Sequence, residues 1–254
     1  MYSIIKERFL NYIDLPVSRE QKNILDELKL KHTYRVVEIS EILAASIFGN
    51  DCAEYIELAK IIALLHDIAR WNQLLEYNGF TDIKHDHGEM GADIILQKYM
   101  LNGLEEHKKQ IVLTAVREHN KKHTHIYDDF IQKFVNIVRD ADKIDNLYIE
   151  VENYGNKDNS MKNILPFSDE HILSPRIYNS IMDGTLADSK DRETKIDFKF
   201  FKIAWCYDIK TAKGIELIIE NKYLENIYSD IDNPDETMRA AYSKIWHYLD
   251  KLKI

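Results

Sequence analysis

Histidine and aspartate side chains recur along this chain where a helix would otherwise place apolar residues. They are His32, His66, Asp67, His87, His119 and Asp142. An imidazole or a carboxylate is costly to bury without a partner. Both groups are common ligands of divalent metals, and a bound cation would compensate for their burial. The pattern therefore indicates a metal-binding site.

The adjacent pair His66 and Asp67 is the strongest part of this pattern. It follows residues 58–65, which are apolar on nearly every face of a helix. A helix that is apolar all round is buried. A helix over 53–67 would therefore carry an imidazole and a carboxylate into the interior, where a divalent metal is the expected counter-charge.

Helical phase selects the last aspartate. A helix is expected over about 127–149, and five of its residues follow one another at steps of four, three, four and three: Ile131, Val135, Val138, Asp142 and Asp145. Asp142 should share the buried face of this helix, whereas Asp140 is turned roughly 200° away. The spacing predicts Asp142 as the ligand.

The other three histidines also belong to expected helices. His32 lies four residues before Val36, at the core side of the entrance to a helix over 33–49. His87 falls in the first turn of a helix that has Asp86 as its N-cap and runs to about residue 100. His119 ends the apolar stripe of a helix over about 105–119.

The rest of the chain favours helices too. Eight Gly and four Pro are few for 254 residues, and alternating strand-like patterns are nearly absent. We expect an all-α fold with a helical core over 1–150, opening with a helix at about 2–13. A break follows at Leu15-Pro16, and 71–86 is expected to be a connection with a turn at Asn78-Gly79. Gly91 would let its helix approach a neighbour closely.

A helical extension packed on this core is expected over 151–254. The composition becomes polar and irregular after Glu150, and Ser174-Pro175 then opens a helix. The final helix, over 235–253, should be amphipathic and turn four apolar residues inward: Met238, Ala241, Ile245 and Leu249. No motif marks a function for this region.

Composition limits the partners. The formal net charge of −9 argues against polymeric nucleic acid, whose backbone needs a basic face. No apolar run is long enough to span a membrane, and no signal peptide is visible. Cys52 and Cys206 lie far apart and suit small buried thiols in a cytoplasmic protein. A homodimer is left open.

Three strings around these residues resemble the HD superfamily of metal-dependent phosphohydrolases. They are HTYRVVEIS at His32, ALLHDIARW at His66-Asp67 and VRDADKIDNL at Asp142. HGEMGADIIL at His87 and VREHN at His119 resemble the subset that holds two metals, and His87 fits that string better than His85. The similarity covers roughly residues 25–150 and implies an HD-type helical bundle.

The resemblance implies a division of the ligands. His32, His66, Asp67 and Asp142 would hold one tightly bound divalent metal, and Asp67 would bridge to a second metal held by His87 and His119. A mixed nitrogen and oxygen set suits Mn, Fe, Co, Ni or Zn better than Mg. A metal-bound hydroxide would then attack phosphorus, as expected of a phosphohydrolase or phosphodiesterase.

The implied substrate is a small phosphate ester, with nucleotides the largest class. Positively charged residues near the ligands are candidates for binding it: Arg35, Arg70, Arg117 and Lys143. Arg70, one turn after Asp67, is also expected to act in catalysis with Asp67. Lys121, Lys122, His123 and His125 are more typical of a solvated surface.

Two acidic residues and two other functions stay open at this point. Asp145 could orient a ligand or contact substrate, or only stabilise its helix or form buried hydrogen bonds. Asp82 could transfer a proton or serve as a turn residue. Some HD relatives use the same six-ligand order to hold two irons and cleave a C–C or C–P bond with O₂, so a di-iron oxygenase is the alternative function. A non-catalytic binding module is a third, and the complete ligand set argues against it.

Overall fold

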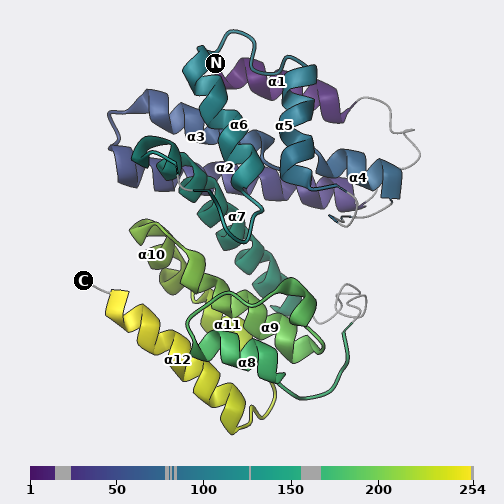
Figure 1. Cartoon of the computed structure of the whole chain (residues 1–254), viewed down its shortest axis with the longest axis vertical. Helices are drawn as coiled ribbons and strands as arrows, with labels where there is room; N and C mark the ends of the chain where they lie inside the picture. The colour runs from purple at the N-terminus through teal and green to yellow at the C-terminus, as the bar shows by residue number, and fades with distance from the viewer. Residues whose placement is uncertain are drawn as a thin grey trace. The chain divides into compact units, whose positions relative to one another are not determined.

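The computed structural model describes residues 1–14, 24–77, 80, 82, 85–125, 127–155 and 167–252. Within these ranges the regular elements are helices, and the β-type pairing is limited to an isolated bridge between Ser168 and Thr194 (Figure 1). The predicted all-α fold is confirmed. The chain divides into two compact units, Met1–Asp145 and Asn146–Ile254. The sequence analysis placed this division after residue 150.

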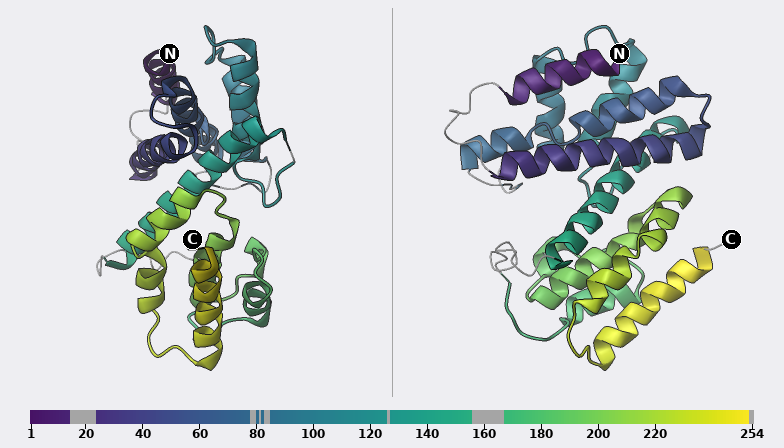
Figure 2. Two further views of the ribbon diagram at one scale, coloured as in Figure 1. Left: turned by 90° about the vertical axis from the view of Figure 1, so that its left-hand side faces the viewer. Right: turned by 180° about the vertical axis from the view of Figure 1, so that it is seen from behind.

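The first unit carries the predicted metal ligands. Its helices are α1 (Tyr2–Ile13), α2 (Ile24–Phe48), α3 (Ala53–Leu65), α4 (Arg70–Tyr77), α5 (His87–Gln97), α6 (Glu106–Glu118) and the first part of α7 (Asp129–Gly155). α2 lies beside α3, and α5 lies beside α6 (Figure 2). The helices expected at 2–13 and 105–119 are confirmed, and the one expected at 53–67 ends two residues early.

α3 is the centre of this unit. Its residues from Leu58 to Leu65 are buried, apart from Lys60, whose ammonium pairs with Glu41 at 2.7 Å. α1, α2 and α6 all pack against α3, which explains why its sequence is apolar on nearly every face. Because α3 is covered on all sides, the residues at its C-terminal end lie in the interior.

α2 begins nine residues earlier than predicted. His32 therefore lies well inside this helix, and the prediction that it stands at the helix entrance is wrong. Residues 24–31 lack a clear apolar stripe but are rich in good helix formers, and Asp26 and Glu27 in the first turn favour the positive end of the helix dipole. The longer helix fixes the backbone on both sides of His32.

Residues 71–86 are not simply a connection. Most of the first half forms α4, in which Trp71 and Gln73 are buried. The backbone N–H of Arg70 donates to the carbonyl of Asp67 at 2.8 Å, so a single tight turn joins α3 to α4. The break at Leu15-Pro16 and the turn at Asn78-Gly79 lie outside the described residues.

α5 approaches α6 most closely at Gly88. A Cβ on Gly88 would lie 2.8 Å from the carbonyl oxygen of Arg117 and 2.9 Å from that of Val116. A Cβ on Gly91 would meet Val116 at 3.4 Å, an ordinary contact. The close approach predicted at Gly91 therefore occurs one turn earlier. The predicted N-cap is confirmed, because the Asp86 carboxylate accepts hydrogen bonds from the N–H groups of Gly88 and Glu89.

The second unit contains the remaining helices. They are the end of α7, α8 (Pro175–Met182), η3 (Ser189–Asp191), α9 (Lys195–Ile203), η4 (Ala204–Asp208), α10 (Ala212–Glu220), α11 (Tyr223–Ser229) and α12 (Glu236–Leu252). Ser174 precedes α8 as predicted, and the four inward residues of α12 are fully buried. Cys52 and Cys206 are both free thiols. None of the described helices combines the length and apolarity needed to cross a bilayer.

We expect Gly88→Ala to destabilise the protein and Gly91→Ala to be neutral or stabilising. The new methyl at Gly88 would collide with backbone carbonyls, and such overpacking costs about 1–3 kcal/mol. At Gly91 the methyl has room, and alanine gains up to about 1 kcal/mol of helix propensity. Urea denaturation of both variants measures the difference. Equal stabilities would contradict the close packing at Gly88.

Candidate metal centre

The first unit brings all six predicted ligands together. His32, His66, Asp67 and Asp142 form one group whose ligand atoms lie within 4.8 Å of one another, and Asp67, His87 and His119 form a second group with the same spacing. Asp67 belongs to both groups. The structure therefore joins, through one carboxylate, residues that are up to 110 positions apart in the sequence.

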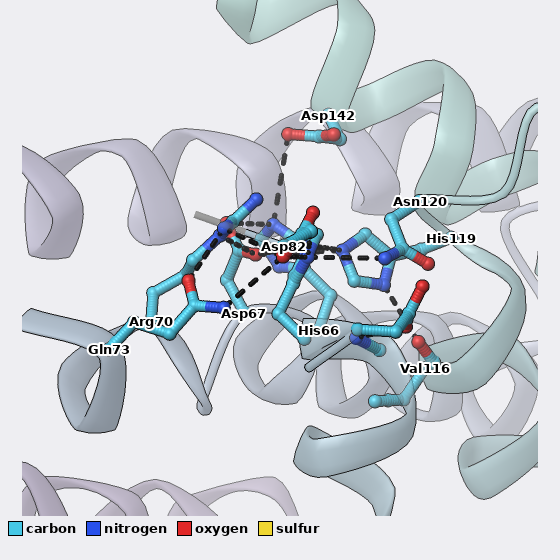
Figure 3. Close-up of polar contacts among 12 residues, drawn as sticks. His66, Asp67, Arg70, Gln73, Asp82, Val116, His119, Asn120 and Asp142 are labelled. Atoms are coloured by element: carbon cyan, nitrogen blue, oxygen red, sulfur yellow. Dashed lines mark hydrogen bonds and ion pairs between the residues drawn. The ribbon is translucent and has the colours of Figure 1, made fainter. Parts of the chain in front are cut away.

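Helix ends supply most of this cluster. His66 is the C-cap of α3, His119 is the C-cap of α6, and His87 is the first residue of α5. Figure 3 shows His66, Asp67 and His119 turned toward one another, with Asp142 reaching the same region from α7. The C-terminal ends of α3 and α6 carry partial negative charge, which favours a cation between them.

Each of the four histidines has its Nδ1 beside an oxygen acceptor. His66 Nδ1 donates to the carbonyl of Ala63, and His119 Nδ1 donates to the carbonyl of Val116, both at 2.7 Å. The other two acceptors are carboxylates: Asp145 for His32 at 2.6 Å and Asp82 for His87 at 2.8 Å. Such contacts place the proton on Nδ1 and leave the Nε2 lone pair for a metal.

The Nε2 atoms point into the cluster, and two of them lack hydrogen-bond partners. His32 Nε2, His66 Nε2 and Asp67 Oδ1 are buried without any hydrogen bond, which is costly for polar atoms. His87 Nε2 and His119 Nε2 lie within hydrogen-bond distance of each other, at 3.0 Å. Coordination to divalent cations would satisfy all of these atoms, so the residues fit a metal site.

The two oxygens of Asp67 face different groups. Oδ2 lies 3.2 Å from His66 Nε2 and 3.5 Å from His32 Nε2. Oδ1 lies 3.2 Å from His87 Nε2 and 3.5 Å from His119 Nε2. A carboxylate arranged in this way can give one oxygen to each of two metals, as the resemblance to HD proteins implied.

Asp142 completes the first group, but not for the reason that the helical phase suggested. Its Oδ1 lies 3.2 Å from His32 Nε2, and its side chain is 24% exposed. Asp140, which was expected to face away from the core, is completely buried. α7 is therefore covered on more than one face. Asp142 lies where the helix borders the cluster, and its partial exposure gives this side of the site access to solvent.

The ionisation states of Asp67 and His119 suit a metal site. Burial alone would raise the pKa of Asp67, but the positive charges of Lys29 and His66 hold it well below its usual range. Burial lowers the pKa of His119 to about 4, so this ring is neutral at pH 7, the form that coordinates a metal. Burial also opposes protonation of His32, but Asp142, Asp145 and Asp67 raise its pKa to about 9. A proton on His32 would therefore compete with a metal.

Asp145 supports the first group from behind. Its carboxylate contacts His32 Nδ1 and also binds Arg35, whose Nε lies 2.5 Å from Oδ1 and whose Nη2 lies 3.1 Å from Oδ2. Asp145 is therefore a buried carboxylate in contact with a candidate ligand, and its role in orienting that ligand stays a prediction. Arg35, expected to bind substrate, is instead paired with this buried carboxylate, and a substrate role for it stays a prediction.

Asp82 and Arg70 support the second group. Asp82 contacts His87 Nδ1 and accepts a hydrogen bond from Arg70 Nη1 at 3.2 Å. Arg70 Nη1 also donates to Gln73 at 2.7 Å, and Arg70 Nε lies 3.5 Å from Asp67 Oδ1. Burial would raise the pKa of Asp82, but His87 and Arg70 lower it to about 2. Asp82 is therefore an anion that holds both of these residues.

The other predicted residues belong to neither ligand group. Lys143 follows Asp142 on α7 and is half-buried, and Arg117 pairs with Glu89 at 3.3 Å. His85, the alternative to His87, is exposed and belongs to neither group. Further along, Lys121 pairs with Asp86 at 2.8 Å, whereas Lys122 and His123 are exposed. His125 is exposed as well and contacts Glu118. The substrate roles of Lys143 and Arg117 stay predictions.

Lys29 is the residue that the sequence analysis missed. Its ammonium forms an ion pair with Asp67 Oδ2. A signal was present, because extending α2 backwards from His32 puts Lys29 one turn earlier on the same face, while Lys31 is turned away. The predicted helix begins at residue 33, so it does not include Lys29.

One family model matches the chain, that of the HD domain, over residues 30–147. These residues form an HD domain. The matched segment contains the six clustered residues and both carboxylates behind them. The HD domain is characteristic of a superfamily of metal-dependent phosphohydrolases. Neither a curated protein nor a solved structure matches the chain.

The HD domain should lose one of two metals when His87 and His119 are both replaced by alanine. The second group would then keep only Asp67, while the first keeps its four ligands, so about one metal per chain should remain. Mass spectrometry of anaerobically purified protein gives the metal content. The exposed pair His107→Ala and His123→Ala is the control. Unchanged metal content in the first variant would remove both histidines from the ligand set.

Asp145→Ala should weaken metal binding at the first group. Loss of the partner behind a metal-bound histidine typically costs about 10–100-fold in metal affinity. Asp145→Asn, which can still accept a hydrogen bond from His32, should lose less. Calorimetric titration of metal-free protein with Mn²⁺ measures the affinity, and Asp93→Ala on the exposed face of α5 is the control. An affinity that does not change would limit Asp145 to helix packing.

Proposed function

We propose that this protein is a metal-dependent phosphohydrolase that releases phosphate from a small phosphate ester, with nucleotides as the first class to test. The observation that carries the proposal is the pair of ligand groups joined by Asp67, with four histidines that all present Nε2 to this one carboxylate. A cluster with both nitrogen and oxygen donors suits Mn, Fe, Co, Ni or Zn. This arrangement supports two metals when the site is fully loaded.

When bound, two divalent ions would supply an activated water and would polarise the phosphoryl oxygens. The protein's own residues provide the rest. Asp67 sets the separation of the two ligand groups, and the contacts at each Nδ1 fix the direction of each Nε2. Two divalent ions would also reverse the local field, so a net charge of −9 does not prevent an anionic substrate from binding.

Arg70 is the best-placed residue for holding a phosphoryl group. Asp82 and Gln73 hold its guanidinium, and Asp67 lies within ion-pair distance. A guanidinium offers several N–H donors to phosphate, which makes charge-assisted hydrogen bonds. Because Arg70 already has partners on one side, it would reach the substrate with little loss of conformational freedom.

A substrate screen tests the proposal. Protein purified anaerobically and loaded with Mn²⁺ is incubated with phosphate monoesters, including nucleoside monophosphates, and orthophosphate is measured. Release of orthophosphate that stops on chelation and resumes on adding metal is the expected result. Two irons per chain with oxygen uptake and no phosphate release would contradict the proposal.

Asp67→Ala should abolish phosphate release, whereas Arg70→Ala should slow it. Asp67 is shared by both ligand groups, so its loss disrupts both, and turnover should fall to background. Loss of Arg70 removes about one hydrogen bond to a charged group, or roughly ten- to a hundredfold in kcat/KM. Steady-state kinetics measure both variants. An active Asp67→Ala enzyme would end the hydrolase proposal, and unchanged kinetics for Arg70→Ala would remove its substrate role.

A further inference from the structure

Lys29 brings a largely buried ammonium into the metal centre. It lies on α2 three residues before His32, so both side chains leave the same face of the helix. Its Nζ pairs with Asp67 Oδ2, and the side chain is only 15% exposed. Among the described residues no second carboxylate pairs with this ammonium. Lys29 therefore neutralises Asp67 in the protein without metal.

The oxygen that Lys29 contacts is the one that a metal in the first group needs. Oδ2 is the Asp67 oxygen that lies near His66 Nε2 and His32 Nε2. A divalent ion held by those nitrogens would coordinate Oδ2, and the ammonium would then lie a few ångströms from a second positive charge. Like charges at such separations repel strongly where water is largely excluded. Lys29 and the metal therefore compete for one atom.

Arg70, the other cation beside Asp67, is held differently. It lies farther from the carboxylate, at 3.5 Å from Oδ1, and it is also bound by Asp82 and Gln73. These contacts would remain if a metal took Oδ1. Lys29 has no such second ion pair among the described residues. Its Nζ lies over the ring of Phe80, 5.8 Å from the centroid, and its stem is flexible.

We propose that Lys29 is an exchangeable counter-ion of Asp67. Its ammonium stabilises the carboxylate in the metal-free protein, and a divalent metal at the first group displaces it from Oδ2. The metal site is therefore pre-assembled around an internal cation, and metal affinity is set in part by the loss of this ion pair. The inference rests on metal binding by the cluster, and it does not depend on which substrate the protein uses.

Removing the ammonium should tighten metal binding. The full-length protein carrying His87→Ala and His119→Ala, which keeps only the first group, is stripped with chelator and titrated with Mn²⁺ by calorimetry. Adding Lys29→Met should lower Kd about ten- to a hundredfold, the factor that one hydrogen bond to a charged group represents. Lys29→Arg, which keeps the charge, should bind Mn²⁺ much like the parent.

Lys31→Met is the matched control. Lys31 lies on the same helix two residues later, is mostly exposed and pairs with Glu27 at 2.6 Å, so the substitution removes an equal charge without touching Asp67. Its Kd for Mn²⁺ should equal that of the parent. A shift as large as that of Lys29→Met would mean that net charge alone causes the effect, and it would overturn the proposal.

Thermal unfolding gives a second readout, which does not depend on activity. Lys29→Met should lower the Tm of the metal-free protein, because Asp67 loses its counter-ion. Saturating Mn²⁺ should remove most of this difference, because the metal replaces the ammonium in both proteins. A difference of equal size with and without metal would show that Lys29 stays on Asp67, and it would overturn the exchange.

The outcomes separate this proposal from the assignment of the metal site. If the parent binds Mn²⁺ but Lys29→Met binds it equally or more weakly, Lys29 is a fixed support of Asp67, and only the exchange is wrong. If the parent with an intact first group binds no Mn²⁺, both the site and the exchange are wrong. Circular dichroism of each metal-free variant verifies that it folds before titration.

Discussion

The buried negative charge of Asp67 must be compensated, and this requirement explains how the HD domain is organised. Asp67 lies two residues after the fully buried end of α3, so neither of its oxygens can rely on bulk water. An isolated buried carboxylate would be neutralised by a proton. Here its pKa is instead held low by surrounding positive charge. The histidines, Lys29 and Arg70 all lie where they can compensate this one negative charge.

The ends of the helices, as well as their faces, supply the groups that surround this charge. His66 and His119 each use a carbonyl of the preceding turn to fix the ring, which also occupies a carbonyl that the end of a helix leaves without a partner. His32 and His87 lack such a carbonyl and use Asp145 and Asp82 instead. Two kinds of support thus give the same result, four rings with Nε2 directed inward. That common result argues for a ligand site more strongly than the clustering of the histidines does.

The cluster is visible in the sequence because its members interrupt apolar stripes. His66 and Asp67 end a helix that is buried on every side, and His119 ends an apolar stripe on α6, so hydropathy alone marks them. The charged residues that contact the ligands from behind could not be found in the same way. Asp82 and Arg35 are short-range neighbours of ligands in the sequence, but whether a charged side chain turns toward a ligand or toward solvent depends on packing between helices. The start of α2 was missed because its first two turns rely on helix propensity rather than an apolar stripe.

The error about Asp140 shows where helical phase stops being informative. Helical periodicity predicts which residues are buried only when a helix has one buried and one exposed face. α7 does not meet that condition, since Asp140 is completely buried while the candidate ligand Asp142 is partly exposed. For a helix covered on several sides, a polar residue on the most buried face is a structural element with its own partners. Under the proposed function, the ligand is the residue at the border, where a bound ion would meet both the protein interior and an incoming substrate. The same reasoning applies to Lys29 and Arg70, which are mostly covered but lie beside the carboxylate that a metal must reach.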